Sequence, residues 1–159
     1  MADLSSFGRT NGLLLTRDNL CKHQHLNDTS CLLCCEPKSV NHLFFSCDII
    51  KLMWHDISIM LNIPAVLCYE DIAKMWVNNT KLAVANMVTS VFMWMVWKFR
   101  NDVHFGRILW SGLQVLWHRL FRLLVRWKLL CPKNLVPLLE NFLTLLDCKV
   151  REAPQIRVC

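Results

Sequence analysis

The chain has 159 residues, the size of a single domain, and 54% of them are apolar while 19% are charged, so it can bury a substantial core. Its nine cysteines are an odd number, and no apolar stretch of signal-peptide length precedes Leu13. These features argue against a secreted, disulfide-bonded protein. They favour an intracellular, reducing compartment, the nucleus or the cytoplasm, where thiols are free or bound to metal.

The net charge of +6 is unevenly distributed along the chain. Residues 1–47 carry four basic and four acidic side chains, whereas residues 101–130 carry five basic side chains and one acidic one. A basic segment of this kind suits a polyanionic partner, but it equally suits the solvated face of an ordinary helix.

The first predicted element is a short helix that begins at Thr16 and ends between His23 and Leu26. Thr16 is a suitable N-cap, and Asp18 lies in the first turn, where the helix dipole favours an anion. A polar turn at residues 27–30 separates this helix from a cysteine-rich stretch.

That stretch, residues 31–47, contains Cys31, Cys34, His42 and Cys47 in the spacing C-x₂-C-x₇-H-x₄-C. Three sulfurs and one imidazole complete a tetrahedral Zn²⁺ site, and a closed set of four ligands indicates a structural rather than a catalytic metal. The sequence leaves alternatives open. Cys35 adjoins Cys34 and could replace a ligand, and three nearby side chains could compete, namely Cys21, His23 and His25.

Beyond this knuckle, hydrophobic periodicity and breakers predict helices over residues 40–45, 48–61, 70–77, 81–101, 108–130 and 135–148, with a loose tail at 151–159. Pro64 and Pro132 end two of the helices, and Gly106 can close the long one. The predicted fold class is mostly α, with a small zinc-stapled knuckle at the N-terminal side followed by a helical bundle. No strand is expected beyond a possible hairpin at the knuckle.

The helix over 108–130 has the most regular pattern. One side is predicted to be an apolar line of Leu109, Leu113, Leu116, Leu120, Leu124 and Trp127. Arg119, Arg122 and Arg126 lie together on the opposite side and could contact the phosphates of RNA or DNA. The simpler interpretation is that these long basic side chains only cover a solvent-exposed helix face.

The seven tryptophans could in principle stack on bases, but most occupy apolar helical positions and are predicted to pack in the core. Trp76 is expected on the buried face of the helix over 70–77, together with Ile72 and Met75. Trp110, near a helix start, is the least well determined.

The longest charge-free run, residues 82–97, has sixteen residues, including Asn86, Thr89 and Ser90. A membrane span needs roughly 18–20 apolar residues, so this run predicts a buried central helix and makes a membrane partner unlikely. No serine or cysteine lies in a recognisable nucleophile motif, and the acidic residues form no nuclease pattern. We therefore expect neither an enzyme nor a small-molecule substrate.

Three segments together resemble a known family: LLLTRDNL at residues 13–20, CLLC at 31–34, and NHLFFSC at 41–47 followed by Trp54. They are similar to the zinc-binding domain that follows the reverse transcriptase in plant LINE-type (non-LTR) retrotransposons. VWKFRNDVHF at 96–105 resembles the W-K-x-R-N segment that often follows in that family. The resemblance implies that Cys31, Cys34, His42 and Cys47 bind zinc, and that the ancestral role was nucleic-acid handling during target-primed reverse transcription.

The chain departs from the family pattern in its opening segment and at Asp48, where many relatives have proline, and it contains no Tyr-x-Asp-Asp polymerase signature. We expect a disordered or truncated lead-in at 1–12, the zinc-binding domain at 13–105, a helical extension at 106–150 and a tail at 151–159. The predicted function is a non-catalytic zinc-binding module with an ancestral role in nucleic-acid binding. The alternative is a helical interaction or structural remnant in which zinc only staples the fold.

Overall fold

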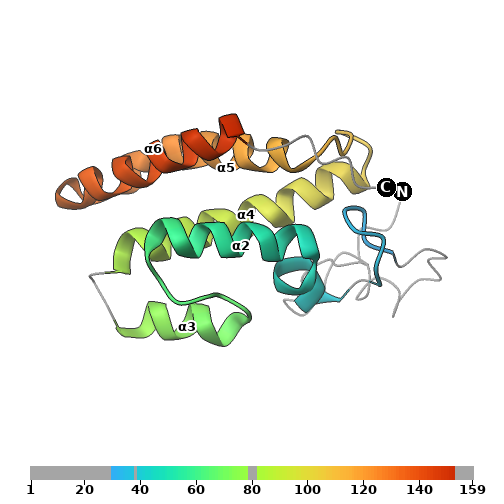
Figure 1. Ribbon diagram of the computed structural model, residues 1–159, viewed down its shortest axis with the longest axis horizontal. Coiled ribbons are helices and arrows are strands. Elements are labelled where there is room, and N and C mark those ends of the chain that lie inside the picture. The colour runs from blue at the N-terminus through green and yellow to red at the C-terminus, as the bar shows by residue number, and fades with distance from the viewer. Residues whose placement is uncertain (1–29, 38, 79–81, 153–159) are drawn as a thin grey trace, which may run out of the picture.

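The computed structural model describes residues 30–37, 39–78 and 82–152. Within these ranges the protein is a bundle of helices with a compact turn at the N-terminal side, and no named strand occurs (Figure 1). This confirms the predicted mostly α fold with a knuckle before the helices. The predicted lead-in at 1–12, the predicted helix at residues 16–26 and residues 153–159 of the predicted tail lie outside the described residues. Residues 151 and 152, which were predicted to belong to the tail, are helical.

Helix α2, Asp48–Leu61, has the bounds that the sequence predicted. Its apolar stripe includes Ile50, Met53 and Ile57, which are buried. The helix ends because Asn62 adopts a left-handed conformation (φ 51°). The amide of Asn62 donates to the carbonyl of Ile59, and that of residue 63 donates to the carbonyl of Ser58, which is the Schellman pattern of hydrogen bonds. Pro64 then keeps the chain from continuing as helix.

Helix α4, Ala83–His104, is the central element, as its nearly all-round apolar character predicted. It packs against α3 (Tyr69–Asn78), against α5 (Leu113–Trp127) and against the segment that carries His42. Gly106 closes it with a positive φ of 65°, as expected. None of the helices in the described residues is long and apolar enough to cross a membrane, including α4, which contains residues 83–97 of the charge-free run.

The helix predicted over residues 108–130 is shorter than expected. Gly112 has φ 127°, a conformation that a helix cannot contain, so α5 begins at Leu113. Leu109, predicted on the buried line, consequently lies outside the helix and is 86% exposed. At the other end, Lys128–Leu130 tightens into a 3₁₀ turn. The buried line itself is confirmed for Leu113, Leu116, Leu120 and Leu124.

Helix α6, Val136–Glu152, returns along α5 and also contacts α2. The side-chain Nε2 of Gln114 donates to the backbone carbonyl of Val150 at 3.3 Å, and Lys149 forms an ion pair of 2.8 Å with Asp56 of α2. In space, α3 and α5 lie against α4, and α6 lies against both α5 and α2 (Figure 1). Helix α2 reaches α4 through the ring of Trp54, which meets Phe92. The largest fully buried side chains include Trp54, Trp117, Phe92 and Phe99, so the core runs through the whole bundle.

Candidate metal centre

The knuckle is a tight turn in which the backbone folds back on itself. The amide of Cys31 donates to the carbonyl of Glu36 at 2.6 Å, and the amide of Cys35 donates to the carbonyl of Cys31 at 2.9 Å. Cys35 takes the left-handed conformation that such a turn needs, with φ 63°. The predicted hairpin is reduced to one isolated antiparallel bridge between Ser30 and Pro37. The turn brings Cys31 and Cys34 close enough to act on a common ion.

The second half of the site lies on one π-helical turn, His42–Ser46. The amide of Cys47 donates to the carbonyl of His42 at 3.1 Å, which is the i→i+5 bond of a π turn. In an α-helix, residues five apart point about 140° away from one another, since each residue turns by 100°. The wider π turn instead brings residue 47 back toward the side of residue 42, and their ligand atoms lie within 4.8 Å of one another. The H-x₄-C spacing therefore matches this local geometry.

The structure brings the four predicted ligands together. One ligand atom from each of Cys31, Cys34, His42 and Cys47 lies within 4.8 Å of the others, and Cys34 Sγ is 3.2 Å from His42 Nε2. In a tetrahedral zinc site with bonds of about 2.0–2.3 Å, ligand atoms stand about 3.3–3.8 Å apart. A small contraction of the cluster would therefore suffice to hold Zn²⁺. Cys34 is half-buried and the other three residues are buried, as expected for a structural site.

The three cysteines of the cluster differ in the direction in which their pKa is shifted. A hydrogen bond with Cys47 lowers the pKa of Cys31 to about 3 against the opposing effect of burial, and the charge of Arg100 lowers it further. The same hydrogen bond raises the pKa of Cys47, burial adds to this, and Arg100 opposes it. Burial raises the pKa of Cys34. Zinc binds cysteine as thiolate, so a metal ion that enters the cluster displaces the remaining thiol protons.

His42 is positioned from both sides. Its Nε2 faces Cys34, while its Nδ1 lies 3.8 Å from a carboxylate oxygen of Glu36. Its backbone amide donates to the hydroxyl of Ser39 at 2.9 Å. A carboxylate beside the far nitrogen of a metal-binding histidine orients the ring and favours the tautomer that leaves the near nitrogen free. No role for Glu36 was predicted from the sequence.

The sequence offered four alternative ligands besides these. Cys35 is exposed and does not belong to the cluster, although it adjoins Cys34. Cys21, His23 and His25 lie outside the described residues.

Arg100 of α4 is a residue that sequence reasoning overlooked. It is only 6% exposed, and its charge acts on both Cys31 and Cys47. The signal was available, because Arg100 follows the buried Phe92 and Val96 at intervals of four and so continues their apolar stripe. A cation at such a position needs an anionic partner.

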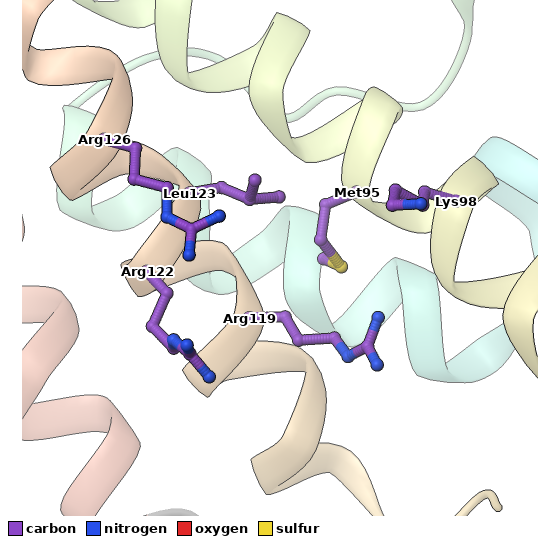
Figure 2. Close-up of a pocket in the computed structure, with 6 residues that line it drawn as sticks. All are labelled: Met95, Lys98, Arg119, Arg122, Leu123 and Arg126. Atoms are coloured by element: carbon purple, nitrogen blue, oxygen red, sulfur yellow. The ribbon is translucent and has the colours of Figure 1, made fainter. Parts of the chain in front are cut away.

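The three predicted arginines lie along a groove between α4 and α5 (Figure 2). The groove has a volume of about 250 Å³ and is lined by Met95, Lys98, Arg119, Arg122, Leu123 and Arg126. Arg119 is partly neutralised, since its Nη1 lies 3.1 Å from a carboxylate oxygen of Asp102. Arg122 and Arg126 are exposed, and in the described part of the chain neither is paired with a carboxylate.

The tryptophans follow the predicted core packing only in part. Trp54 and Trp117 are fully buried, and Trp97, Trp110 and Trp127 are half-buried. Two are exceptions: Trp76 is 52% exposed and Trp94 is 46% exposed. The prediction for Trp76 was wrong because α3 buries a narrow face, represented by Ile72 and Met75, that does not extend to it. Trp94 stacks on Trp97, with ring centroids 5.0 Å apart and 29° between the planes.

Comparison with known proteins gives one match. Residues 8–54 match the model of a family described as zinc-binding in reverse transcriptase. No curated protein and no solved structure matches the chain. The matched segment contains the whole cysteine–histidine cluster and ends at Trp54. Together the match and the cluster support the assignment of residues 8–54 as a zinc-binding module similar to that found in reverse transcriptases.

Proposed function

We propose that this chain is a non-catalytic, zinc-stapled module of plant non-LTR retrotransposon origin that binds nucleic acid in a reducing, intracellular compartment. The observation that carries the proposal is the cluster of Cys31, Cys34, His42 and Cys47 inside the segment that matches the zinc-binding family. The proposal assigns the chain no catalytic residue, small-molecule substrate or membrane partner.

In this proposal the four clustered side chains hold Zn²⁺, which supplies a structural cross-link between the knuckle and the π turn. The π turn is already packed in the core through Leu43, Phe44 and Phe45, so the metal would mainly hold the knuckle, which buries only Cys31 and Leu33. Cys35 provides a matched control because it adjoins Cys34 but is exposed and outside the cluster.

The test is the zinc content of protein purified under reducing conditions. We expect one zinc per chain in the wild type and in Cys35→Ser, and substoichiometric zinc in Cys34→Ser and His42→Ala. Less than one zinc in the wild type contradicts the proposal. Equal loss from Cys35→Ser and Cys34→Ser would show that the cluster has been assigned wrongly.

The nucleic-acid part of the proposal rests on the α4–α5 groove. A second hollow along α5 is lined by Gln114, Val115, His118, Arg119 and Arg122, so it shares two arginines with the first. Together the two hollows follow α5 from Gln114 to Arg126, about 18 Å at 1.5 Å per residue. The basic side chains occupy the second half of this length, from Arg119 to Arg126, with Lys98 across from them on α4. Several cations spread along a groove with apolar side chains between them suit a phosphate backbone better than a single anion.

An exposed aromatic ring favours single-stranded RNA or DNA as the ligand. Trp94 lies one helical turn before Lys98 on α4, and Trp97 stacks against its ring and limits its motion. Unpaired bases stack on such rings, whereas the bases of a duplex are already stacked on one another. The proposed ligand therefore places phosphates along α5 and one base on Trp94.

Salt titration measures how many cations take part. Three of them are available, Lys98, Arg122 and Arg126, because Arg119 is paired with Asp102. For a single strand, the slope of log K against log salt is then about −2. Arg122→Gln with Arg126→Gln should reduce it to about −0.7, while Lys74→Gln on α3 should leave it unchanged. No affinity for a mixed-sequence single strand even at low salt would refute this part.

The alternative, a helical interaction module in which zinc is only a staple, is favoured by the exposed leucines of the 3₁₀ turn after α5. Leu129 is almost fully exposed and its neighbour Leu130 largely so. Gel filtration distinguishes the two functions. A stable oligomer that dissociates on Leu129→Ser with Leu130→Ser and ignores nucleic acid would favour the interaction module.

A further inference from the structure

Arg119 differs from the other arginines of the groove because its charge is already balanced. Its Nη1 lies 3.1 Å from Oδ2 of Asp102 on α4, and the other oxygen of that carboxylate lies 3.6 Å from Arg107. Arg122 and Arg126 are exposed, and in the described ranges neither is paired with a carboxylate. Since Asp102 offsets the charge of Arg119, this arginine adds little to the attraction for phosphate.

Two contacts hold the guanidinium of Arg119 in one orientation. Besides the ion pair, its Cζ lies 5.1 Å from the centroid of the Phe99 ring, which is a cation–π distance. Phe99 is fully buried and the side chain of Asp102 is only 13% exposed, so both contacts come from the packed part of α4. Figure 2 shows the side chain of Arg119 extending away from those of Arg122 and Arg126.

The fixed guanidinium keeps donors that other groups can use. An arginine has five N–H donors in a planar fork, and the hydrogen bond to Asp102 comes from Nη1. The side chain is still 32% exposed, so part of the fork faces solvent. A planar group that is held rigidly and has little net charge is suited to directional hydrogen bonds rather than to long-range attraction.

The space beside Arg119 can accept a base. Arg119 lines the groove between α4 and α5 and also the second hollow, whose volume is about 410 Å³. That volume falls within the range of ligand pockets, about 300–1,000 Å³. Val115 gives the hollow an apolar side, and Arg122 places a cation for phosphate at its edge. A nucleotide could therefore have its phosphate at Arg122 and its base at Arg119.

Guanine is the base that best matches the donors of an arginine. Its O6 and N7 are adjacent acceptors, and arginine can donate to both at once. Adenine presents N7 beside an amino group that is itself a donor, cytosine presents a donor, and thymine presents one acceptor. In a single strand these edges are not covered by pairing, so a side chain can reach them directly.

We propose that Arg119 determines the base specificity of the nucleic-acid site by donating to O6 and N7 of an unpaired guanine, and that Asp102 is the residue that positions it. This inference rests on the proposed nucleic-acid binding. It goes beyond it by dividing the groove into two parts with different tasks. Lys98, Arg122 and Arg126 contact phosphates, whereas Arg119 contacts a base.

The first test uses the wild-type chain and short oligothymidine strands that carry guanine, adenine or 7-deazaguanine at one central position. 7-Deazaguanine keeps the size and O6 of guanine but has a C–H group in place of N7, so it removes one of the two acceptors. Affinity is measured by fluorescence anisotropy at low salt. We expect the guanine strand to bind about tenfold more tightly than the adenine strand, with the 7-deazaguanine strand between them.

Three variants separate base reading from charge. Arg119→Lys keeps the positive charge but not the planar fork, so the preference for guanine should fall to about twofold or less while the salt slope stays unchanged. Asp102→Asn releases Arg119, so the same preference should be lost while the salt slope steepens. Arg122→Gln is the control: it should weaken binding of all three strands equally and reduce the salt slope by about 0.7, with the preference intact.

The outcomes separate this inference from the proposed function. Wild type that binds none of the strands at low salt overturns both. Wild type that binds the guanine and adenine strands equally overturns the role of Arg119 alone. So does a guanine preference that survives in Arg119→Lys or that 7-deazaguanine shares in full. If Arg119→Lys does not fold, the 7-deazaguanine strand and Asp102→Asn carry the comparison.

Discussion

The indole of Trp54 connects α2 to the π turn that carries His42, so its replacement should affect both stability and zinc binding. Its Nε1 donates to the carbonyl of Phe44 at 2.7 Å. Its ring stacks on Phe45, with centroids 6.0 Å apart, and meets the edge of Phe92 on α4 at 4.6 Å. Trp54→Phe keeps an aromatic ring in the site but removes the donor and part of the volume.

The expected cost follows from these contacts. Taking a donor away from a buried carbonyl costs about 1–3 kcal/mol. The void left by the smaller ring adds to this, but the sum should stay below the 3–5 kcal/mol typical of truncating a buried tryptophan to alanine. We expect a loss of about 2–3 kcal/mol, which for a chain of this size lowers the melting temperature by roughly 4–12 °C.

The assay is thermal and urea unfolding in saturating zinc, together with chelator competition. Because Phe44 lies between His42 and Cys47, loosening of the turn should also weaken zinc binding, by about tenfold for each 1.4 kcal/mol that the bound state loses. Trp76→Phe is the control, since this exposed ring should tolerate the change within about 0.5 kcal/mol. Equal stability of the two variants would refute the reasoning, and a stability loss without any change in zinc affinity would show that the turn is not coupled to the site.

Three further predictions concern the rest of the molecule. Gly106→Ala should cost about 1 kcal/mol by denaturant unfolding, because the added methyl meets nothing within 4 Å and only the φ of 65° opposes it. Asp102→Asn should cost about 1–2 kcal/mol by removing the partner of Arg119, and should steepen the salt dependence of nucleic-acid binding by about 0.7 as that arginine is released. Removal of zinc by chelation should increase hydrogen exchange at residues 31–47 while α5 and α6 retain protection, since their contacts are with each other, α2 and α4.

Much of the fold was predictable because its signals are local. The bounds of α2 follow from an apolar stripe that stops at Asn62 and Pro64, and the end of α4 follows from Gly106. The start of α5 was predicted wrongly because the apolar periodicity continues through residues 108–112. The backbone of Gly112, with φ 127°, is not helical, so the helix begins only after it. Side-chain periodicity contains no direct information on φ. Gly112 should therefore have been predicted to end the coil before the helix, although the apolar line continues to Leu109.

The site shows the same division between local and tertiary information. The ligand set followed from spacing, because a metal site of two short segments is nearly a local property of the chain. The π turn was not predictable from helical periodicity, which assumes 100° per residue throughout. Glu36 belongs to the knuckle itself and was within reach of a local argument, because the same turn that joins Cys31 and Cys34 contains it. The burial of Arg100 depends on the packing of α4 in the folded chain, which a single sequence does not display.

Helix α4 links the two candidate sites and constrains how they can influence each other. Arg100 is buried on the inner side of α4 while Lys98, two residues earlier and about 200° around the helix, is exposed and lines the basic groove. The cations of the groove come from α4 and α5, whose mutual contacts do not involve the knuckle. Loss of zinc should therefore leave the number of phosphate contacts, and hence the salt slope, unchanged. Any fall in affinity would then come from loosening of the C-terminal end of α4, so it should be equal at every salt concentration.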